Sequence, residues 1–309
     1  MIEVSALTKY YGQTRAIYDL SFQIETGQIV GFLGLNGAGK STALKILAGY
    51  LLPTSGTVKI EGVDLIAQPD ALRARIGYLP ERPPLYDEMT IRAYLDYVGR
   101  LRGRDRRFVT QRIGEVSELT GLTPRLDDAI GTLSLGFRKR VGIAQAIVHD
   151  PAMVILDEPI SGLDPVQIVE MRHMIRDLAG KHTVLISSHI LTEVEETCDL
   201  LLMLHEGELI GSGSEQELLG RTKHALDYEL LVVGDAEAAG LLLVEHPLVT
   251  SVTPGRAEAD TRLFSLTLSE DHPEAVAKAL IDAGFGLRRL QADHNPLEDV
   301  FLSMTGGAK

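Results

Sequence analysis

The feature that most constrains the fold of this chain is a short glycine-rich segment between an apolar run and a helical pattern. Residues 28–33 read Gln-Ile-Val-Gly-Phe-Leu, which predicts a buried strand. The segment Gly34-Leu35-Asn36-Gly37-Ala38-Gly39-Lys40-Ser41 follows at once. Residues 40–48 then place apolar side chains at helical spacing, and Gly49 is a typical helix stop. The chain must therefore pass from strand to helix through one glycine loop.

This loop matches the pattern G-x-x-x-x-G-K-[ST], and its position between a strand and a helix makes the match informative. Glycines let successive backbone N–H groups turn toward a polyphosphate, and the positive end of the helix dipole points at the same place. Lys40 brings a full charge to the β and γ phosphates, and Ser41 is placed to bind Mg²⁺. The alternative is a chance match in a chain with 30 glycines. The nucleotide contacts that we expect here come from Gly34, Asn36, Gly37, Ala38, Gly39, Lys40, Ser41 and Thr42.

A second motif combines an apolar run with two acids. Residues 153–156 read Met-Val-Ile-Leu and are followed by Asp157 and Glu158. The carboxyl ends of strands in open α/β sheets are where such folds bind ligands. Asp157 is therefore a candidate to hold Mg²⁺, and Glu158 is a candidate to orient water. The alternative is an acidic strand end that only faces solvent.

The order of patterns along the chain predicts an α/β fold followed by a smaller α+β domain. Residues 1–80 read mostly as strands separated by turns, a helical insert covers about 83–148, a helix covers 165–179 and a strand covers 183–186. Strands that alternate with helices indicate a parallel sheet. We therefore expect two domains, 1–220 and 221–309. The second has the βαββαβ (ferredoxin-like) order, with strands at 226–233, 249–253, 263–268 and 286–291, helices at 237–243 and 273–283, and a short helix at 297–304.

Composition excludes several classes of protein. Lys and Arg total 30 against 43 Asp and Glu, a net charge of -13, so no general attraction to nucleic acid is expected. The single cysteine, Cys198, cannot form an internal disulfide, and the N-terminal residues do not resemble a signal peptide. Apolar runs such as 200–204 are far shorter than the ~18–20 residues that span a bilayer. We expect a cytoplasmic protein that reaches a membrane only through another chain.

Further segments stand at set positions relative to the glycine loop. Leu133-Ser134-Leu135-Gly136-Phe137 lies between the loop and the acid pair, Ser161-Gly162-Leu163-Asp164 follows the acid pair, and His189 follows Ser187-Ser188 at the end of the next strand. Tyr11 lies upstream of the loop. In this order and spacing, residues 1–220 resemble the ATP-binding subunits of ABC transporters. The resemblance implies a P-loop NTPase fold with a mixed sheet core and a helical insert.

The resemblance also implies roles for these residues. Ser134 and Gly136 would approach the γ-phosphate of ATP, Asp164 would lie in the D-loop beside the nucleotide, His189 would steady the γ-phosphate, and Tyr11 would stack on adenine.

Residue type alone leaves simpler explanations open. Ser134 and Gly136 can cap and open a helix, and a lone histidine is more often structural than catalytic. Tyr10 competes with its neighbour Tyr11 for the stacking position. The choice depends on position relative to the phosphate loop.

The sequence departs from the family pattern at two places. Leu135 and Phe137 stand where the signature usually has glycine and glutamine. Glu81, after Ile76-Gly77-Tyr78-Leu79-Pro80, stands where the family usually carries the glutamine of its Q-loop. A carboxylate there could still bind Mg²⁺ or its waters, but it adds negative charge near the phosphates.

The function that the resemblance implies is ATP hydrolysis, with ATP and Mg²⁺ as cofactors, to power a separate transmembrane permease. Catalysis would use Glu158, His189 and Lys40, and the metal would be held by Ser41, Asp157 and Glu81. Two copies would form a homodimer at the cytoplasmic face of the inner membrane, as peripheral subunits, with export the expected direction. The alternatives are a soluble ABC-type ATPase that acts on ribosomes or DNA, and a nucleotide-binding scaffold with little hydrolysis.

Overall fold

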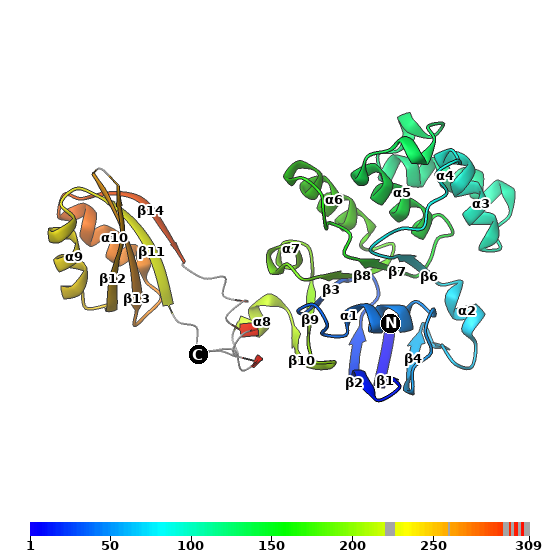
Figure 1. The fold of residues 1–309 in the computed structure, drawn as a ribbon, viewed down its shortest axis with the longest axis horizontal. Helices are drawn as coiled ribbons and strands as arrows, with labels where there is room; N and C mark the ends of the chain where they lie inside the picture. The colour runs from blue at the N-terminus through cyan, green and yellow to red at the C-terminus, as the bar shows by residue number, and fades with distance from the viewer. Residues whose placement is uncertain (220–225, 259, 293–296, 298–299, 302–303, 306–309) are drawn as a thin grey trace. The chain divides into compact units, whose positions relative to one another are not determined.

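The computed structural model describes residues 1–219, 226–258, 260–292, 297, 300–301 and 304–305 (Figure 1). The chain divides into two compact units, Met1–Glu215 and Gln216–Lys309, and each is described by itself. The domain boundary predicted at 220/221 falls on residues that lie outside the described ones.

A mixed sheet forms the centre of the first unit. Its strands are β3 (Ile29–Leu33), β6 (Ile76–Leu79), β7 (Met153–Asp157), β8 (Thr183–Ser188), β9 (Leu200–His205) and β10 (Glu208–Gly213). They lie in the order β10-β9-β3-β8-β7-β6. The pairs of β3 with β8 and β9, and of β7 with β6 and β8, are parallel, whereas β10 pairs antiparallel with β9. This confirms the mixed sheet that the sequence predicts.

A second, antiparallel sheet packs on one face of the central sheet. Its strands are β1 (Ile2–Tyr11), β2 (Thr14–Ile24), β4 (Ser55–Ile60) and β5 (Val63–Asp64), in the order β2-β1-β4-β5. Helix α1 (Lys40–Leu47) and the two sheets share one apolar core. Leu44 and Leu47 of the helix lie in this core with Val30 and Phe32 of β3.

Helices cover the other face of the central sheet. They are α3 (Ile91–Leu101), α4 (Arg106–Leu119), α5 (Leu135–Ile147) and α6 (Pro165–Leu178), with the short 3-10 turns η1 (Thr123–Arg125) and η2 (Ile130–Thr132). Alternate residues of a strand point to opposite faces, so Val154 and Leu156 of β7 join this second core while Met153 and Ile155 join the first. The α3–α5 helices form the predicted helical insert (Figure 1).

The sequence prediction was wrong at one short element in the first 80 residues. Helix α2 (Pro69–Arg73) lies where strands and turns were expected. Its five residues are too few to display a helical repeat, and Pro69 at its first position is a start signal that is easily taken for a turn. The remaining short helices of the described chain are α7 (Leu191–Glu195) and α8 (Glu215–Leu219).

The second unit has the predicted α+β order. It contains β11 (Leu226–Val233), α9 (Ala236–Glu245), β12 (Val249–Glu258), β13 (Thr261–Leu268), α10 (Pro273–Asp282) and β14 (Gly286–Ala292). The strands pair antiparallel in the order β12-β13-β11-β14, and both helices share one core with the sheet. Of the short helix predicted at 297–304, residues 297, 300, 301 and 304 are helical, and residues 298–299 and 302–303 lie outside the described ones.

One glycine fixes the distance between the insert and the sheet. A Cβ on Gly77 of β6 would lie 2.0 Å from the carbonyl oxygen of Ala146 on α5. Both groups belong to backbone that is buried in regular structure, so neither can move aside cheaply. Helix α5 therefore rests directly on the backbone of β6.

We expect Gly77→Ala to destabilise the protein by about 1–3 kcal/mol, the usual cost of forcing extra atoms into a packed core. Gly114→Ala is the matched control, because Gly114 is an exposed residue inside α4 with nothing within 4 Å of an added Cβ. That variant should gain ~0.5–1 kcal/mol from helix propensity. Urea unfolding measures both, and equal midpoints for the two variants would contradict the contact between β6 and α5.

Candidate active site

The carboxyl edge of the central sheet brings the predicted site segments together. The glycine loop follows β3, Glu81 follows β6, Asp157 ends β7 and His189 follows β8. Neighbouring strands hold these positions in register, since Leu33 pairs with Ser188 and Asp157 pairs with Ser187. Segments that are far apart in sequence thus meet at one edge, the place where α/β sheets bind ligands.

The glycine loop is shaped by close contact with neighbouring backbone. A Cβ on Gly34 would lie 2.5 Å from the carbonyl oxygen of Leu204, and a Cβ on Gly39, whose φ is +100°, would lie 2.6 Å from that of Ala16. Only glycine fits at these two positions. The turn between β9 and β10 braces the loop, because the N–H of Gly207 donates to the carbonyl of Ala38 at 3.1 Å. The same glycine accepts a bond from the N–H of Tyr18 in β2 at 2.8 Å.

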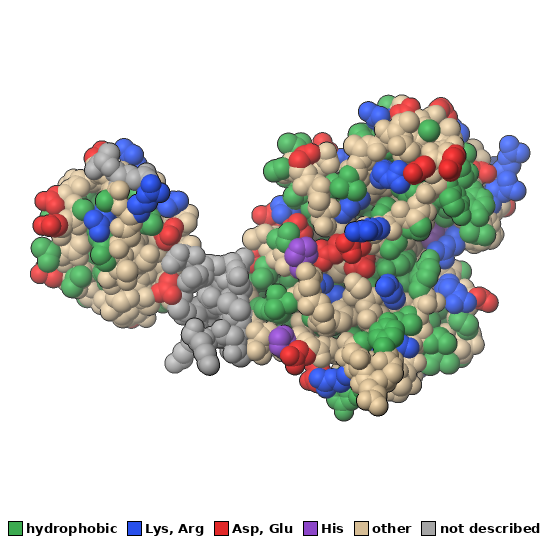
Figure 2. Space-filling model, viewed as in Figure 1, with side chains coloured by type: hydrophobic (Ala, Val, Ile, Leu, Met, Phe, Trp, Pro, Cys, Tyr) green, Lys and Arg blue, Asp and Glu red, His purple; other side chains and the backbone are tan. Residues whose placement is uncertain are grey.

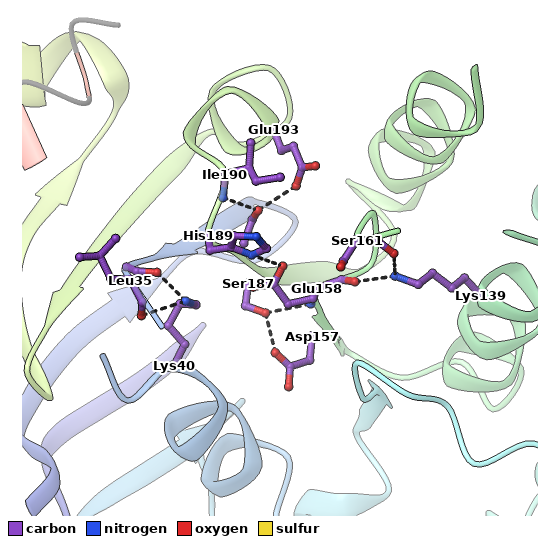
Figure 3. Close-up of polar contacts among 12 residues, drawn as sticks. Leu35, Lys40, Lys139, Asp157, Glu158, Ser161, Ser187, His189, Ile190 and Glu193 are labelled. Carbon is purple, nitrogen blue, oxygen red and sulfur yellow. Dashed lines mark hydrogen bonds and ion pairs between the residues drawn. The ribbon is translucent and has the colours of Figure 1, made fainter. Parts of the chain in front are cut away.

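Lys40 places a buried cation at the start of α1. Its side chain reaches back over the loop, and Nζ donates to the carbonyl oxygens of Gly34 at 2.5 Å and Leu35 at 3.3 Å (Figure 3). Burial lowers the pKa of Lys40 below its ordinary value, while the nearby carboxylates of Glu158 and Asp157 act in the opposite direction. Helix α1 has no side-chain cap, so its first N–H groups and the lysine form one electropositive end.

Asp157 and Glu158 are joined by a buried serine that the sequence prediction did not include among the site residues. The Ser187 hydroxyl donates to Asp157 Oδ1 at 2.6 Å, and the backbone N–H of Glu158 donates to Ser187 Oγ at 3.0 Å (Figure 3). Ser187 is fully buried and Asp157 is 5% exposed. The serine therefore fixes both the metal candidate and the backbone of the base candidate.

Glu158 meets His189 at the edge of the cavity. His189 Nδ1 lies 2.9 Å from Glu158 Oε2, and the Glu158 side chain is only 13% exposed. Figure 2 shows acidic side chains gathered beside a histidine in the area where Figure 1 draws the ends of β7 and β8. The backbone of Glu158 has φ +50°, a left-handed conformation that is unusual for a residue with a side chain. Such conformations are common at functional sites.

These groups surround a cavity of about 440 Å³. Of the predicted residues, those that line it are Asn36, Gly37, Gly39, Lys40, Ser41, Thr42, Glu81, Glu158 and His189. Gly34 and Ala38 belong to the same loop, and Asp157 is bound to Ser187 beside it. A polyphosphate has room here, with a cation on one side and a carboxylate–imidazole pair on the other.

Besides Gly34, Ala38 and Asp157, four further predicted residues of the described first unit do not line this cavity. Tyr11 is half exposed and pairs across the β1–β2 hairpin with Thr14, which does line the cavity. Ser134 is exposed at the start of α5, and its hydroxyl makes no capping bond.

The other two lie near the start of α6. A Cβ on Gly136 would lie 2.3 Å from Oε1 of Gln167 on that helix. Asp164 caps α6, because its carboxylate accepts a bond from the N–H of Gln167 at 3.0 Å.

Sequence reasoning missed several lining or supporting residues. Thr14, Arg15 and Ala16 of β2 line the cavity, and Lys139 of α5 reaches the Glu158 backbone. No local pattern marks these residues, since each depends on how distant segments pack. Ser161 also lines the cavity, and it begins the segment 161–164 that the sequence had marked without giving this serine a role. Ser187 had a weak signal, as a hydroxyl residue at the end of a buried strand next to the acid pair.

The donor set suits a hard cation. Ser41, Asp157 and Glu81 offer one hydroxyl and two carboxylates, and oxygen ligands are those that Mg²⁺ prefers. Among the described residues no group of three or more His, Cys, Asp or Glu is placed to hold a metal by itself. A bound Mg²⁺ would therefore need phosphate oxygens as well, which is its usual arrangement at nucleotide sites.

Several known proteins are similar to this chain over most of its length. The family model described as "ABC transporter" matches residues 17–161. The chain is 33% identical to the bacitracin transport ATP-binding protein BcrA of Bacillus licheniformis, over 99% of this chain and 98% of that protein. It is 31% identical to the Nod factor export ATP-binding protein I of Ralstonia nicotianae, over 99% of this chain and 94% of that protein.

A solved structure, that of an ATP-binding subunit of an ABC transporter, superposes with a TM-score of 0.66 at 31% identity. The superposition covers 72% of this chain and 92% of that one. Within the residues described, no helix is both long enough and apolar enough to cross a membrane.

We expect Ser187→Ala to reduce both stability and turnover. The change leaves Asp157 Oδ1 and the Glu158 N–H without their buried partner, at a cost of about 1–3 kcal/mol. Ser117→Ala is the control, because the Ser117 hydroxyl is equally buried, donates to the Gly114 carbonyl and accepts from Thr123, far from the cavity. Denaturation and phosphate release should show a comparable loss of stability in both variants and a loss of turnover only at position 187. Equal turnover in the two variants would contradict the role of Ser187.

Proposed function

The chain belongs to the ATP-binding subunits of ABC transporters, and from this premise we propose that it hydrolyses ATP in the cavity described above to power export through a separate membrane permease. The observation that carries the proposal is the Glu158–His189 pair, with 2.9 Å between the two side chains, at the same sheet edge as the phosphate loop. An acid–imidazole pair opposite a cationic phosphate cradle is well suited to orient water for attack on a phosphoryl group.

Binding rests on positive charge from two sources. The N–H groups of the loop and of the first turn of α1 face the phosphates, and Lys40 exchanges its bonds to loop carbonyls for stronger bonds to phosphate oxygens. Ser41 and Asp157 would hold Mg²⁺ together with those oxygens, and the exposed Glu81 would bind it directly or through water. When bound, the metal would supply positive charge to offset the charge that develops on the phosphates.

The chemical step is the transfer of the γ-phosphoryl group to water. Glu158 orients the water and takes its proton as the new oxygen–phosphorus bond forms and the bond to ADP breaks. His189 holds the Glu158 carboxylate and steadies the γ-phosphate. The hydrogen bonds of Ser187 fix the backbone from which the Glu158 side chain extends. Most of the catalytic effect therefore comes from position rather than from covalent chemistry.

Two copies of the chain are needed to complete each site in this proposal. Ser134 is exposed and its hydroxyl makes no capping bond, which leaves it available to a nucleotide held by a second copy. Asp164 is exposed at the start of α6, and Gly136, which is buried, lies against Gln167 of the same helix. ATP would then bridge two chains head to tail, and it would favour the closed dimer because only that state contacts it from both sides.

The direction of transport and the partner are proposed from the relatives. One relative is named for bacitracin transport and another for Nod factor export, and both match nearly the whole chain. We assign the permease contact to the segment from Glu81 to Met89, which leads from the cavity to the helical insert. In this proposal the subunit lies at the cytoplasmic face of the membrane, bound through the permease. The net charge of -13 does not favour nucleic acid as an alternative partner.

We expect Glu158→Gln to bind ATP as the parent does and to hydrolyse it ~10²–10⁴-fold more slowly, the range of general-base effects. Phosphate release and nucleotide titration measure the two properties. The control is Glu170→Gln, an exposed carboxylate of α6 that pairs with Arg140 outside the cavity. An unchanged rate for Glu158→Gln would remove Glu158 from the reaction.

We also expect the slow Glu158→Gln variant to accumulate an ATP-bound dimer, since the bridging nucleotide is no longer consumed. Size-exclusion chromatography with ATP should show about twice the chain mass of 33.7 kDa, and ADP should leave the monomer. Adding Ser134→Trp should prevent the shift. A variant that stays monomeric with millimolar ATP would contradict the shared site.

A further inference from the structure

Lys139 is a buried cation whose role the site described so far leaves unexplained. It lies in the second turn of α5 and is 3% exposed. Burial lowers the pKa of Lys139, while Glu158, Glu81 and Glu193 act in the opposite direction. A lysine is rarely buried unless its ammonium group has partners.

The Lys139 ammonium group donates to two carbonyl groups of the segment that follows β7. Nζ donates to the carbonyl oxygen of Glu158 at 2.8 Å and to that of Ser161 at 2.6 Å (Figure 3). The two carbonyls begin and end the turn 158–161, so one ammonium group ties the turn at both ends. The bonds are charge-assisted and lie in a buried setting, which makes them strong and directional.

The turn needs such a restraint because its first residue is strained. Glu158 has φ +50°, a conformation that disfavours any residue with a Cβ. Its N–H is held by Ser187 and its carbonyl by Lys139, so the peptide groups on both sides of its Cα are fixed. If the second bond is lost, the backbone can relax toward ordinary angles and swing the carboxylate away from His189.

We propose that Lys139 is a positioning residue that sets the conformation of Glu158 and thereby links the catalytic carboxylate to helix α5. The inference rests on the proposed role of Glu158 as the base. Helix α5 begins at Leu135, between Ser134 and Gly136, the two residues assigned to the nucleotide of the second copy. Since a helix moves as a rigid element, a shift of its first turn carries Lys139 with it. Glu158 is then correctly placed only when α5 packs against the turn 158–161.

A merely structural lysine and a positioning lysine predict different kinetics. Loss of a structural contact lowers stability, but the folded fraction that remains keeps its turnover number. Loss of a positioning contact lowers kcat and leaves nucleotide affinity unchanged, because Lys139 does not itself line the cavity and its bonds go to the backbone carbonyls of Glu158 and Ser161 and not to the phosphate loop.

The test replaces Lys139 with methionine, which keeps an unbranched, flexible chain one atom shorter than lysine and removes the N–H donors. We expect kcat for ATP to fall about 10–100-fold, as a small misplacement of a catalytic group does, with the Kd for a fluorescent ATP analogue changed less than ~2-fold. Lys139→Arg keeps donors and charge and should recover most of kcat. If the methionine variant does not fold, Lys139→Gln, whose amide is one atom too short to reach both carbonyls, serves the same comparison.

Arg112→Met is the matched control. Arg112 is a mostly buried cation of α4 that donates to the Ile147 carbonyl at the end of α5, away from the turn 158–161. It should cost comparable stability in a thermal melt and leave kcat unchanged. Equal kcat in Lys139→Met and the parent overturns the inference, and so does a fall in kcat that Lys139→Arg fails to recover.

A double variant separates this inference from the proposed function. Single-turnover rates are measured for Glu158→Gln with and without Lys139→Met. If Lys139 acts through the carboxylate, the second change should slow the reaction less than ~3-fold in the glutamine background. A full additional 10–100-fold loss would show that Lys139 acts independently and would overturn the inference. A Glu158→Gln variant with the parent rate would instead refute the proposed function, whatever Lys139 does.

Discussion

Parallel pairing of β6, β7, β8 and β3 is the constraint on which the rest of the molecule depends. The pairing aligns the carboxyl ends of these strands, so the loop that follows each one emerges at the same edge. The pairing also leaves both faces of the sheet to be buried, one by α1 with the antiparallel sheet and the other by the helical insert with α6. The two apolar cores thus hold the polar carboxyl edge of the sheet rigid, and the proposed catalytic residues lie at this edge.

The fold could be predicted from sequence wherever a local pattern is long or chemically distinctive. The strand at 153–156 is a continuous apolar run followed by two acids, and the glycine loop requires a strand before it and a helix after it. The βαββαβ order of the second unit followed from alternating patterns of ordinary length. Helix α2 could not be seen, because five residues make little more than one turn.

The motif residues of the site could be predicted from the sequence, but the contacts that hold them in place could not. The segments that contain Lys40, Glu158 and His189 have residue types that indicate their chemical roles. The structure brings these three residues to one cavity. The left-handed backbone of Glu158 and the buried bonds of Ser187 and Lys139 arise from strand register and helix docking. Such contacts join residues that no local pattern connects. They also decide how the charges interact, because the same lysine or carboxylate in water would have little effect on its neighbours.

The turn between β9 and β10 illustrates how far this dependence extends. It is short, polar and close to the surface, the kind of place where a protein engineer would insert a tag or a fluorescent reporter. Yet Gly207 bonds to the glycine loop on one side and to β2 on the other, and a Cβ there would lie 2.8 Å from the Ala16 carbonyl. A tag or reporter inserted into that turn would distort the glycine loop. Labels on this protein are better inserted in turns whose backbone makes no hydrogen bonds to other segments.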